Sequence, residues 1–271
     1  MQTTTNQLLH EIKKNKKYST IADEIVLEEI NNYLKKNKIE KVTKQDIKEI
    51  RNQLHKLYSS YQTSKKNKRQ KYFKELEQNI NNLDIINKIL STNISTKERL
   101  EDYENIYNEI FNITGNPKII VDIGCGLNPI SYPYMNLNEL TYYAFEIDNE
   151  DINFLNEFFN IMKNQGLNGK AQILNVRNLQ EIVHLPSSDI IFLFKVIDLI
   201  DLKNHKPSEE LIKILISKTK FIVASFATKT ISKKSMNFPN RKWFELMLQR
   251  IGLKFQTIKT RNEIFYVISK N

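Results

Sequence analysis

Two rhythms of apolar residues divide this chain. Over residues 1–112, apolar side chains recur every three or four positions, the spacing of one buried helix face. No glycine or proline precedes Gly115 to interrupt such helices. Thr43 and Asp46 form a capping-box pattern at one helix start, and a run beginning at Ser95 predicts a further helix whose apolar stripe reaches Phe111. We therefore predict an all-helical domain over residues 1–112.

From residue 118 the pattern changes to alternating strands and helices, which is typical of an α/β domain with a mostly parallel sheet. We assign residues 113–271 to this Rossmann-like domain and expect its last two strands to be antiparallel. The expected strands are Lys118–Ile123, Thr141–Ile147, Ala171–Val176, Asp189–Phe194, Phe221–Phe226, Leu253–Lys259 and Glu263–Ser269. The expected helices between them are Ile152–Asn164, Ser208–Ile216 and Arg241–Ile251.

The first of these strands ends in a glycine turn. Residues 119–130 read I-I-V-D-I-G-C-G-L-N-P-I, with Asp122 before Gly124 and Gly126. Ligands of open α/β sheets bind at such carboxyl ends of strands. The third glycine of a pyrophosphate cradle is absent and position 129 is Pro129, which disfavours that site. An acid before G-x-G resembles the first motif of S-adenosylmethionine-dependent methyltransferases, whose sheet also ends in an antiparallel strand pair; the alternative is an ordinary strand-to-loop turn.

Charge is distributed unevenly along the 271 residues. Residues 1–100 carry 21 Lys+Arg against 12 Asp+Glu, residues 101–200 carry 5 against 14, and residues 201–271 carry 15 against 5. Basic flanks suit a polyanion such as RNA, and the acidic middle suits a cationic cofactor. The densest basic cluster consists of Lys65, Lys66, Lys68, Arg69, Lys71 and Lys74. A solvated helix face in a lysine-rich chain is the competing interpretation.

Composition narrows the class of protein. Hydrophobic residues make up 40% and charged residues 27% of the chain, as in ordinary globular proteins. The amino terminus lacks the apolar core of a signal peptide, and no stretch is apolar enough to span a bilayer. The four histidines lack metal-ligand spacing and Cys125 stands alone. We expect a cytoplasmic, monomeric protein without a metal site or a membrane partner.

Polar residues at other strand ends are candidates for ligand binding. Glu146 follows the second strand, where an acid accepts hydrogen bonds from ribose hydroxyls, whereas Asp148 is placed to cap the next helix. Asn175 and Val176 follow the third strand. Lys195 ends the apolar fourth strand, where a buried lysine needs a partner. The alternative for Lys195 is a surface lysine whose stem lies along apolar residues.

Three segments together resemble one family. Ser95–Leu100 (S-T-K-E-R-L), Asp122–Pro129 (D-I-G-C-G-L-N-P) and Phe194–Ile200 (F-K-V-I-D-L-I) are similar, in this order and spacing, to the aminoglycoside-resistance 16S rRNA methyltransferases of Arm/Rmt type. These enzymes modify N7 of a decoding-site guanine. Further similarity over Leu54–Tyr61, Ala224–Lys229, Lys242–Glu245 and Asn262–Tyr266 extends the resemblance to roughly residues 45–270.

The resemblance implies a role for each matching residue. Arg99 is expected to bind the carboxylate of S-adenosylmethionine, and Lys195 to lie beside the target base as the catalytic residue. The other cofactor-binding residues implied are Asp122, Gly124, Gly126, Glu146, Asn175 and Val176. The helical domain is expected to dock on 16S rRNA of the 30S subunit. The expected RNA-binding residues are His55, Lys65, Lys66, Lys68, Arg69, Lys71, Lys229, Lys233 and Lys234.

The sequence also departs from the family pattern. Asp198 and Ala227 stand where the family favours proline, and the loop at Ser232–Met236 lacks its usual glycine. These positions lie near the expected acceptor pocket, so the target nucleotide is left open. Methylation of guanine N7 requires no general base, because that nitrogen carries a free lone pair. The alternatives are a methyltransferase of another RNA, and a non-catalytic RNA-binding or ribosome-assembly protein with a vestigial pocket.

Overall fold

The structure, a computed structural model, describes residues 5–39, 41–57, 63, 65–200, 205–229 and 240–270. Its amino-terminal half holds α1 (Thr5–Lys13), α2 (Asp23–Asn37), α3 (Lys44–Leu57), η2 (Lys66–Lys68), α4 (Arg69–Gln78), α5 (Leu83–Leu90), α6 (Ile94–Arg99) and α7 (Tyr103–Thr114). The strands are β1 (Ile119–Ile123), β2 (Leu140–Glu146), β3 (Leu167–Ile173), β4 (Ser188–Phe194), β5 (Thr219–Ala227), β6 (Leu253–Lys259) and β7 (Glu263–Lys270). Between them lie η3 (Asn128–Met135), α8 (Asn149–Met162), η4 (Lys163–Gln165), α9 (Leu179–Ile182), α10 (Ile197–Ile200), α11 (Lys206–Leu215) and α12 (Lys242–Arg250).

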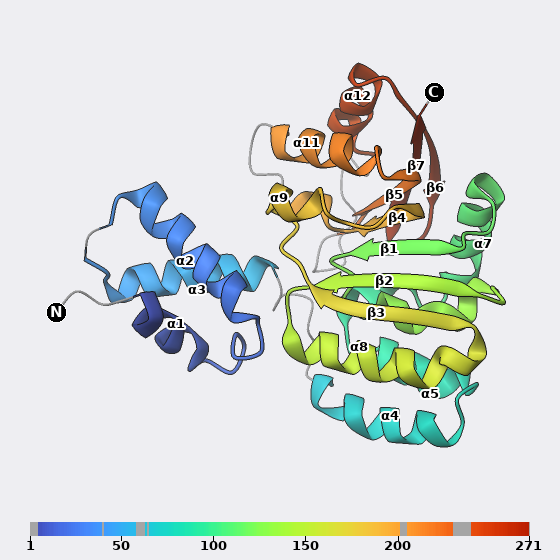
Figure 1. Cartoon of the computed structure of the whole chain (residues 1–271), viewed down its shortest axis with the longest axis horizontal. Helices are drawn as coiled ribbons and strands as arrows, with labels where there is room; N and C mark the ends of the chain where they lie inside the picture. Colours follow the sequence, from blue (N-terminus) through green and yellow to red (C-terminus); the bar gives the residue numbers. More distant parts are fainter. Residues whose placement is uncertain are drawn as a thin grey trace.

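The seven strands form one sheet in the order β3-β2-β1-β4-β5-β7-β6. All neighbours are parallel except β7, which runs antiparallel to β5 and β6. The predicted Rossmann-like α/β fold and its antiparallel final pair are therefore confirmed. Figure 1 shows the sheet seen nearly edge-on, with α4, α5 and α8 on one side and α9, α11 and α12 on the other.

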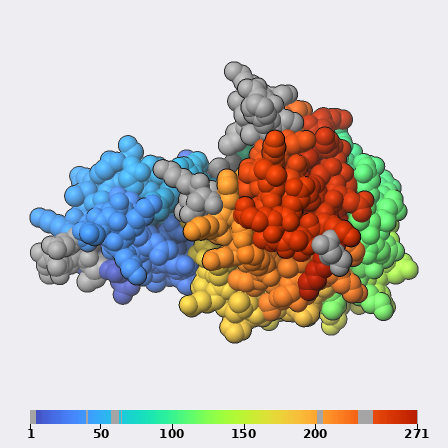
Figure 2. Space-filling model, turned by 90° about the horizontal axis from the view of Figure 1, so that it is seen from above, coloured from blue at the N-terminus to red at the C-terminus, as the bar shows by residue number. Residues whose placement is uncertain are grey.

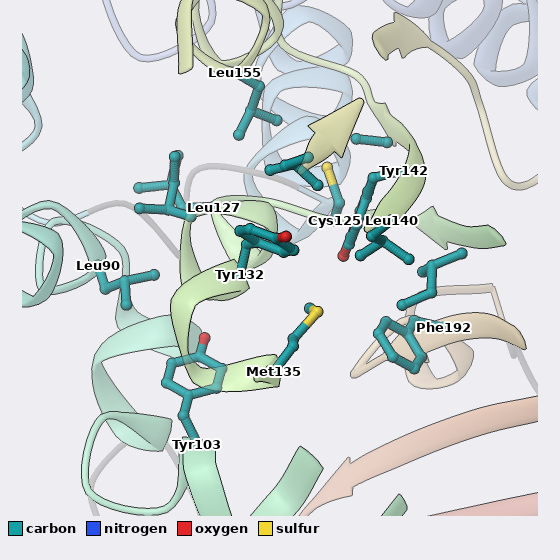
Figure 3. Close-up of a cluster of buried hydrophobic side chains, with 14 of the residues drawn as sticks. Leu90, Tyr103, Cys125, Leu127, Tyr132, Met135, Leu140, Tyr142, Leu155 and Phe192 are labelled. Atoms are coloured by element: carbon teal, nitrogen blue, oxygen red, sulfur yellow. The ribbon is translucent and has the colours of Figure 1, made fainter. Parts of the chain in front are cut away.

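Alternate strand residues fill two separate cores. In β1, Ile120 faces the core under α4, α5, α7 and α8, whereas Val121 and Ile123 face the core under α9, α11 and α12. Because both faces are covered at the centre of the sheet, β1, β4 and β5 read as nearly continuous apolar runs, as buried parallel strands do. Figure 3 shows the first core below the glycine turn, where Cys125 and Tyr142 lie together above Met135.

The helical half is divided by its packing. Helices α1–α3 form a three-helix lobe with a core of its own, including Leu8, Ile30 and Leu54, whereas α4, α5 and α7 share the core of the sheet. Figures 1 and 2 show this lobe projecting from the body of the molecule. A domain boundary near residue 112 stays a prediction, and the packing adds a second division after α3.

Two expected elements differ most from the structure. The third strand begins at Leu167, four residues earlier than predicted, and ends at Ile173. The residues from Asn168 onward are mostly polar, and a glycine such as Gly169 is typical of a turn. The sequence pattern therefore did not indicate a strand here. A Cβ at Gly169 would lie 2.1 Å from the Phe159 ring, so this glycine lets α8 pack against the strand.

The single helix expected from Ser95 is two helices. Asn93 caps α6, because its side-chain oxygen accepts a hydrogen bond from the Ser95 amide at 3.0 Å. The chain then turns after Arg99, whose carbonyl accepts from the Asp102 amide at 2.8 Å, and α7 starts at Tyr103. By contrast, the predicted capping box is confirmed, since the Thr43 amide donates to the Asp46 carboxylate at 2.8 Å.

Candidate active site

A pocket opens at the carboxyl ends of β1, β2 and β4. It encloses about 870 Å³ of space, part of it open to solvent, which is a size suited to a small organic ligand. Eight of the expected site residues line it or lie directly beneath it. The lining includes Asn93, Arg99, Gly124, Gly126, Glu146, Asn175, Val176, Phe194 and Lys195, together with Ile25 from the three-helix lobe.

The glycine turn forms the floor of this pocket. Gly124 and Gly126 both have positive φ, +64° and +51°, in the left-handed region that favours glycine. A Cβ on Gly124 would lie 2.8 Å from Cγ2 of Val196. The Cys125 amide donates to the Phe145 carbonyl at 3.0 Å and ties the turn to the end of β2. The floor is therefore bare backbone, open to the close approach of a ligand.

Asp122 lies beneath this turn, fully buried. Its Oδ2 accepts hydrogen bonds from Tyr142 at 2.6 Å and from Asn128 at 3.0 Å. Its Oδ1 is buried with no hydrogen-bond partner among the described residues. Burial raises the pKa of Asp122 to about 6, although the two hydrogen bonds oppose this. An unsatisfied buried oxygen of this kind is costly in a folded protein and is typical of functional sites.

Glu146 ends β2 at the rim of the glycine turn. Its carboxylate accepts from the Gly126 amide at 2.8 Å and from the Ile147 amide at 2.8 Å. Burial nevertheless raises its pKa to about 7. Asp148 plays the other role considered for this strand end: it caps α8, accepting from the Asp151 amide at 3.0 Å, which confirms that interpretation. Glu146 is thus bonded to the glycine turn, whereas Asp148 is bonded to the start of a helix.

Asn175 lies two residues past β3 and is held from both sides. Its Nδ2 donates to the Glu28 carboxylate of α2 at 2.7 Å, and its Oδ1 accepts from the Arg177 amide at 3.0 Å. Val176 lines the pocket beside it. The lobe therefore reaches the pocket at this end.

A buried network of charges forms the opposite wall. Arg99 makes a two-pronged pair with Glu263, with both N···O distances at 2.8 Å, and its guanidinium lies over the Phe194 ring. Glu263 also accepts from the Ser225 hydroxyl. Burial opposes the charge of Glu263, but Arg99 and Lys195 together hold the pKa of this carboxyl below its usual value. The family role implied for Arg99 towards a cofactor carboxylate stays a prediction.

Lys195 belongs to the same network. Its ammonium donates to Glu98 at 2.6 Å and lies 3.6 Å from Glu263. Its side chain is only 10% exposed, so it is not the surface lysine of the alternative interpretation. Its backbone has φ +62°, a strained value for a residue with a side chain. Such strain is held in place by its surroundings and is concentrated at functional sites.

The basic cluster divides into inward and outward members. Arg69 is buried and pairs with Asp151, while Lys66 pairs with Glu150 at 3.0 Å and with Asp148 at 3.4 Å. The side chains of Lys66 and Arg69 therefore form ion pairs with acids at the start of α8. Lys65, Lys68, Lys71 and Lys74 are exposed, and His55 and Lys229 are half-buried. Lys233 and Lys234, with the rest of the altered loop at Ser232–Met236, lie outside the described residues.

Three acids around this site had no role in the prediction from sequence: Glu263, Glu98 and Glu28. Only Glu263 gave a signal, as an acid at the first position of an otherwise apolar strand, where a charge needs a partner. Within the described residues, no group of three acidic, histidine or cysteine side chains is arranged to hold a metal ion. No helix there is long and apolar enough to cross a bilayer.

Comparisons with known proteins agree with this arrangement. The family model described as "Ribosomal RNA methyltransferase (FmrO)" matches residues 14–267. The chain is 30% identical over 188 residues to a 16S rRNA (guanine(1405)-N(7))-methyltransferase of Micromonospora echinospora, which covers 68% of this chain and 66% of that protein. It is 30% identical over 195 residues to the protein of the same description from Proteus mirabilis, covering 69% and 66%. These matches span just under two thirds of the relatives' own length.

Solved structures share the fold. The 16S rRNA methyltransferase RmtF, determined with S-adenosyl-L-homocysteine, superposes with a TM-score of 0.79 at 20% identity over 100% of both chains. The 16S rRNA methylase RmtB superposes with a TM-score of 0.74 at 21% identity, also over 100% of both chains. At these identities the likeness shows the fold, including the helical half before the sheet.

Proposed function

Because this chain belongs to the ribosomal RNA methyltransferase (FmrO) family, we propose that it transfers a methyl group from S-adenosylmethionine to N7 of a guanine in 16S rRNA. The main observation behind the proposal is that one pocket is bounded by two different kinds of wall. A bare glycine floor with an acid suits a nucleoside, and a strained lysine in a buried charge network faces it. The relatives' printed description supplies the nitrogen.

The pocket residues fit this cofactor. Gly124 and Gly126 leave room for its methionine part, and Glu146 keeps a carboxylate at the strand end where ribose hydroxyls bind. We place the adenine beside Asn175 and Val176, which both line the pocket. The unpartnered oxygen of Asp122 adds negative charge beneath the turn, which favours a cationic ligand. When bound, S-adenosylmethionine supplies an electrophilic methyl group on a sulfonium.

The protein's part in the reaction is positioning. Guanine N7 has a lone pair at neutral pH, so no side chain has to remove a proton before the attack. Holding that nitrogen in line with the methyl group is the main requirement. We assign Lys195 to this task, because its ammonium can donate to guanine O6, which lies beside N7 on the same edge of the base. Glu98 and Glu263 hold the ammonium in the pocket wall.

The expected substrate is 16S rRNA within the assembled small subunit, and the expected site of action is the cytoplasm, with the protein acting as a monomer. Four exposed lysines in and just before η2 and α4 suit phosphate contacts: Lys65, Lys68, Lys71 and Lys74. The target guanine has to leave its stack to reach the pocket. We extend the proposal to aminoglycoside resistance, which growth of an expressing, otherwise susceptible bacterium on these drugs would test.

Lys195→Ala provides a direct test. We expect turnover on 30S subunits to fall by about one to two orders of magnitude, the loss of a hydrogen bond from a charged donor of ~1.5–3 kcal/mol. Calorimetry should give unchanged affinity for S-adenosylmethionine. Lys220→Ala is the matched control, because Lys220 is 75% exposed and pairs with Asp189 at 2.9 Å at the opposite end of the sheet. Full activity of Lys195→Ala would remove this lysine from the mechanism.

The wild-type protein tests the reaction itself. Mass mapping of small-subunit RNA, with and without the protein, should reveal one N7-methylguanine. If neither S-adenosylmethionine nor S-adenosylhomocysteine binds at millimolar concentration, the enzymatic proposal is lost. If the cofactor binds and the methyl group appears in another RNA, the substrate is wrong. Cofactor binding without any methylation would favour a non-catalytic ribosome-assembly protein.

A further inference from the structure

We propose that the three-helix lobe completes the adenine end of the cofactor pocket, and that Glu28 is a positioning residue acting through Asn175. This inference rests on the proposed cofactor and goes beyond it, because it gives the lobe a part in cofactor recognition. The carrying observation is that α2 contributes both a pocket-lining residue, Ile25, and the partner of a second one, Asn175.

The contacts fix the Asn175 amide in one orientation. Its Nδ2 donates to Glu28 at 2.7 Å, and its Oδ1 accepts from the Arg177 amide at 3.0 Å. A carboxylate accepts and never donates, while a backbone amide only donates, so the flipped amide would face both partners wrongly. Asn175 is only 5% exposed, so water does not readily replace either partner. Glu28 and the Arg177 amide together therefore determine which group of Asn175 faces the ligand.

An oriented amide is suited to reading a base. Adenine presents an amino donor beside a ring-nitrogen acceptor, whereas hypoxanthine presents a carbonyl oxygen beside an N–H. A site whose donors and acceptors are fixed rejects the mismatched base, because its buried polar groups are left unpaired. Glu28 is not itself a lining residue of the pocket, so it acts on the base through the Asn175 amide that it holds.

The three-helix lobe is attached to the sheet domain on both sides of the contact between Glu28 and Asn175. The Ala22 amide donates to the Ile147 carbonyl at 2.9 Å, and the Asn149 amide donates to the Thr20 carbonyl at 2.9 Å. One residue after Glu28, Glu29 pairs with Arg177 at 2.9 Å. A ligand that contacts both the sheet and α2 stabilises these joints, since whatever binds the closed arrangement better shifts the population towards it.

The test compares two ligands by calorimetry, S-adenosylhomocysteine and its inosine analogue S-inosylhomocysteine. Wild type should prefer the adenine form. Glu28→Ala should raise the Kd for S-adenosylhomocysteine by about tenfold, as expected for one lost hydrogen bond to a charged group, and should reduce the preference between the bases. Glu28→Gln keeps an acceptor for Asn175 and should recover most of the affinity and most of the base preference. Glu24→Ala is the matched control, because Glu24 is exposed on the same helix.

Hydrogen exchange provides an independent readout. S-adenosylhomocysteine should slow exchange at the Ala22 and Asn149 amides in wild type and in Glu24→Ala, but less in Glu28→Ala. If wild type binds and Glu28→Ala keeps the same affinity and base preference, the inference is overturned while the proposed function stands. If wild type itself binds neither ligand, the proposed function has failed first. An equal loss of affinity and base preference in Glu24→Ala would mean that α2 acts only through general stability. That result would also overturn the role of Glu28.

Discussion

At the scale of single residues, Gly124 carries two constraints that can be separated by experiment. Gly124→Ala should cost about 1–2 kcal/mol of folding free energy from its left-handed backbone, and should weaken cofactor binding, because the new Cβ would lie 2.8 Å from Val196 and disturb the pocket floor. Gly252→Ala is the matched control: φ is +76° there, but nothing lies within 4 Å of the added Cβ. Both should lower the melting temperature, and only Gly124→Ala should raise the Kd in calorimetry. Equal cofactor affinity in the two variants would contradict a close approach of the ligand to this turn.

Glu146 gives cofactor binding a pH dependence. Burial raises its pKa to about 7, so the free protein exchanges a proton there near neutrality. Ribose hydroxyls donate to the ionised carboxylate, and binding should therefore tighten as pH rises through 7. Between pH 6.5 and 8 the Kd for S-adenosylhomocysteine should fall about fourfold, in proportion to the ionised fraction. This window lies above the pKa of about 6 of Asp122. Glu146→Gln should bind more weakly and with a flat profile; a flat wild-type profile would mean that Glu146 does not titrate on binding.

At residue level, the sequence predicted the place and shape of the glycine turn, because a local pattern determines them. Asp122, Gly124 and Gly126 form a motif whose spacing requires a strand end and a bare turn, and the structure has both. Glu263 escaped prediction, because its role depends on Arg99, which is 164 positions away and is brought near only by the sheet order. Pairings at that distance follow from the fold and leave little trace in local sequence.

At the scale of elements, the basic cluster of η2 and α4 should behave as two groups. Changing Lys65, Lys68 and Lys71 together to glutamate should weaken binding to 30S subunits and flatten its salt dependence, because phosphate contacts release counterions. Cofactor affinity and melting temperature should stay near wild type. The measurement is subunit binding at several salt concentrations, together with methylation of naked 16S rRNA for comparison. Equal activity of wild type and triple variant on subunits would contradict a docking role.

Arg69→Ala is the contrasting variant for the same element. Arg69 is buried against Asp151 and also donates to the Thr92 hydroxyl at 2.7 Å. Asp151 keeps Lys66 at 3.5 Å, so the loss should be smaller than the ~3–5 kcal/mol typical of a buried charge left uncompensated. We therefore expect a lower melting temperature, in contrast to the exposed lysines. The sequence predicted a helical region over these residues and shows their charges, but not which charges face the body, since that depends on the acids at the start of α8.

At the scale of the whole molecule, the alternation of strands and helices was enough to predict the sheet, whereas the arrangement of the helical half was not predictable. Apolar stripes in α1–α3 and in α4–α7 look alike in sequence, yet one set packs on itself and the other on the sheet. Periodicity identifies a buried face but not the surface that buries it. The shifted start of β3 has a related cause, because Gly169 is explained only by the Phe159 ring on α8.

The pair between Arg99 and Glu263 also bears on how the protein folds. Its two members lie 164 residues apart, and β7, which carries Glu263, is inserted between β5 and β6. Contacts of such long sequence separation form late, because closing long loops costs entropy before the contact is gained. Until β7 is in place, the glycine turn and Glu146 can be formed, yet Lys195 and Arg99 lack their shared carboxylate. We therefore expect full cofactor affinity and RNA methylation to appear together, in the last kinetic phase of folding.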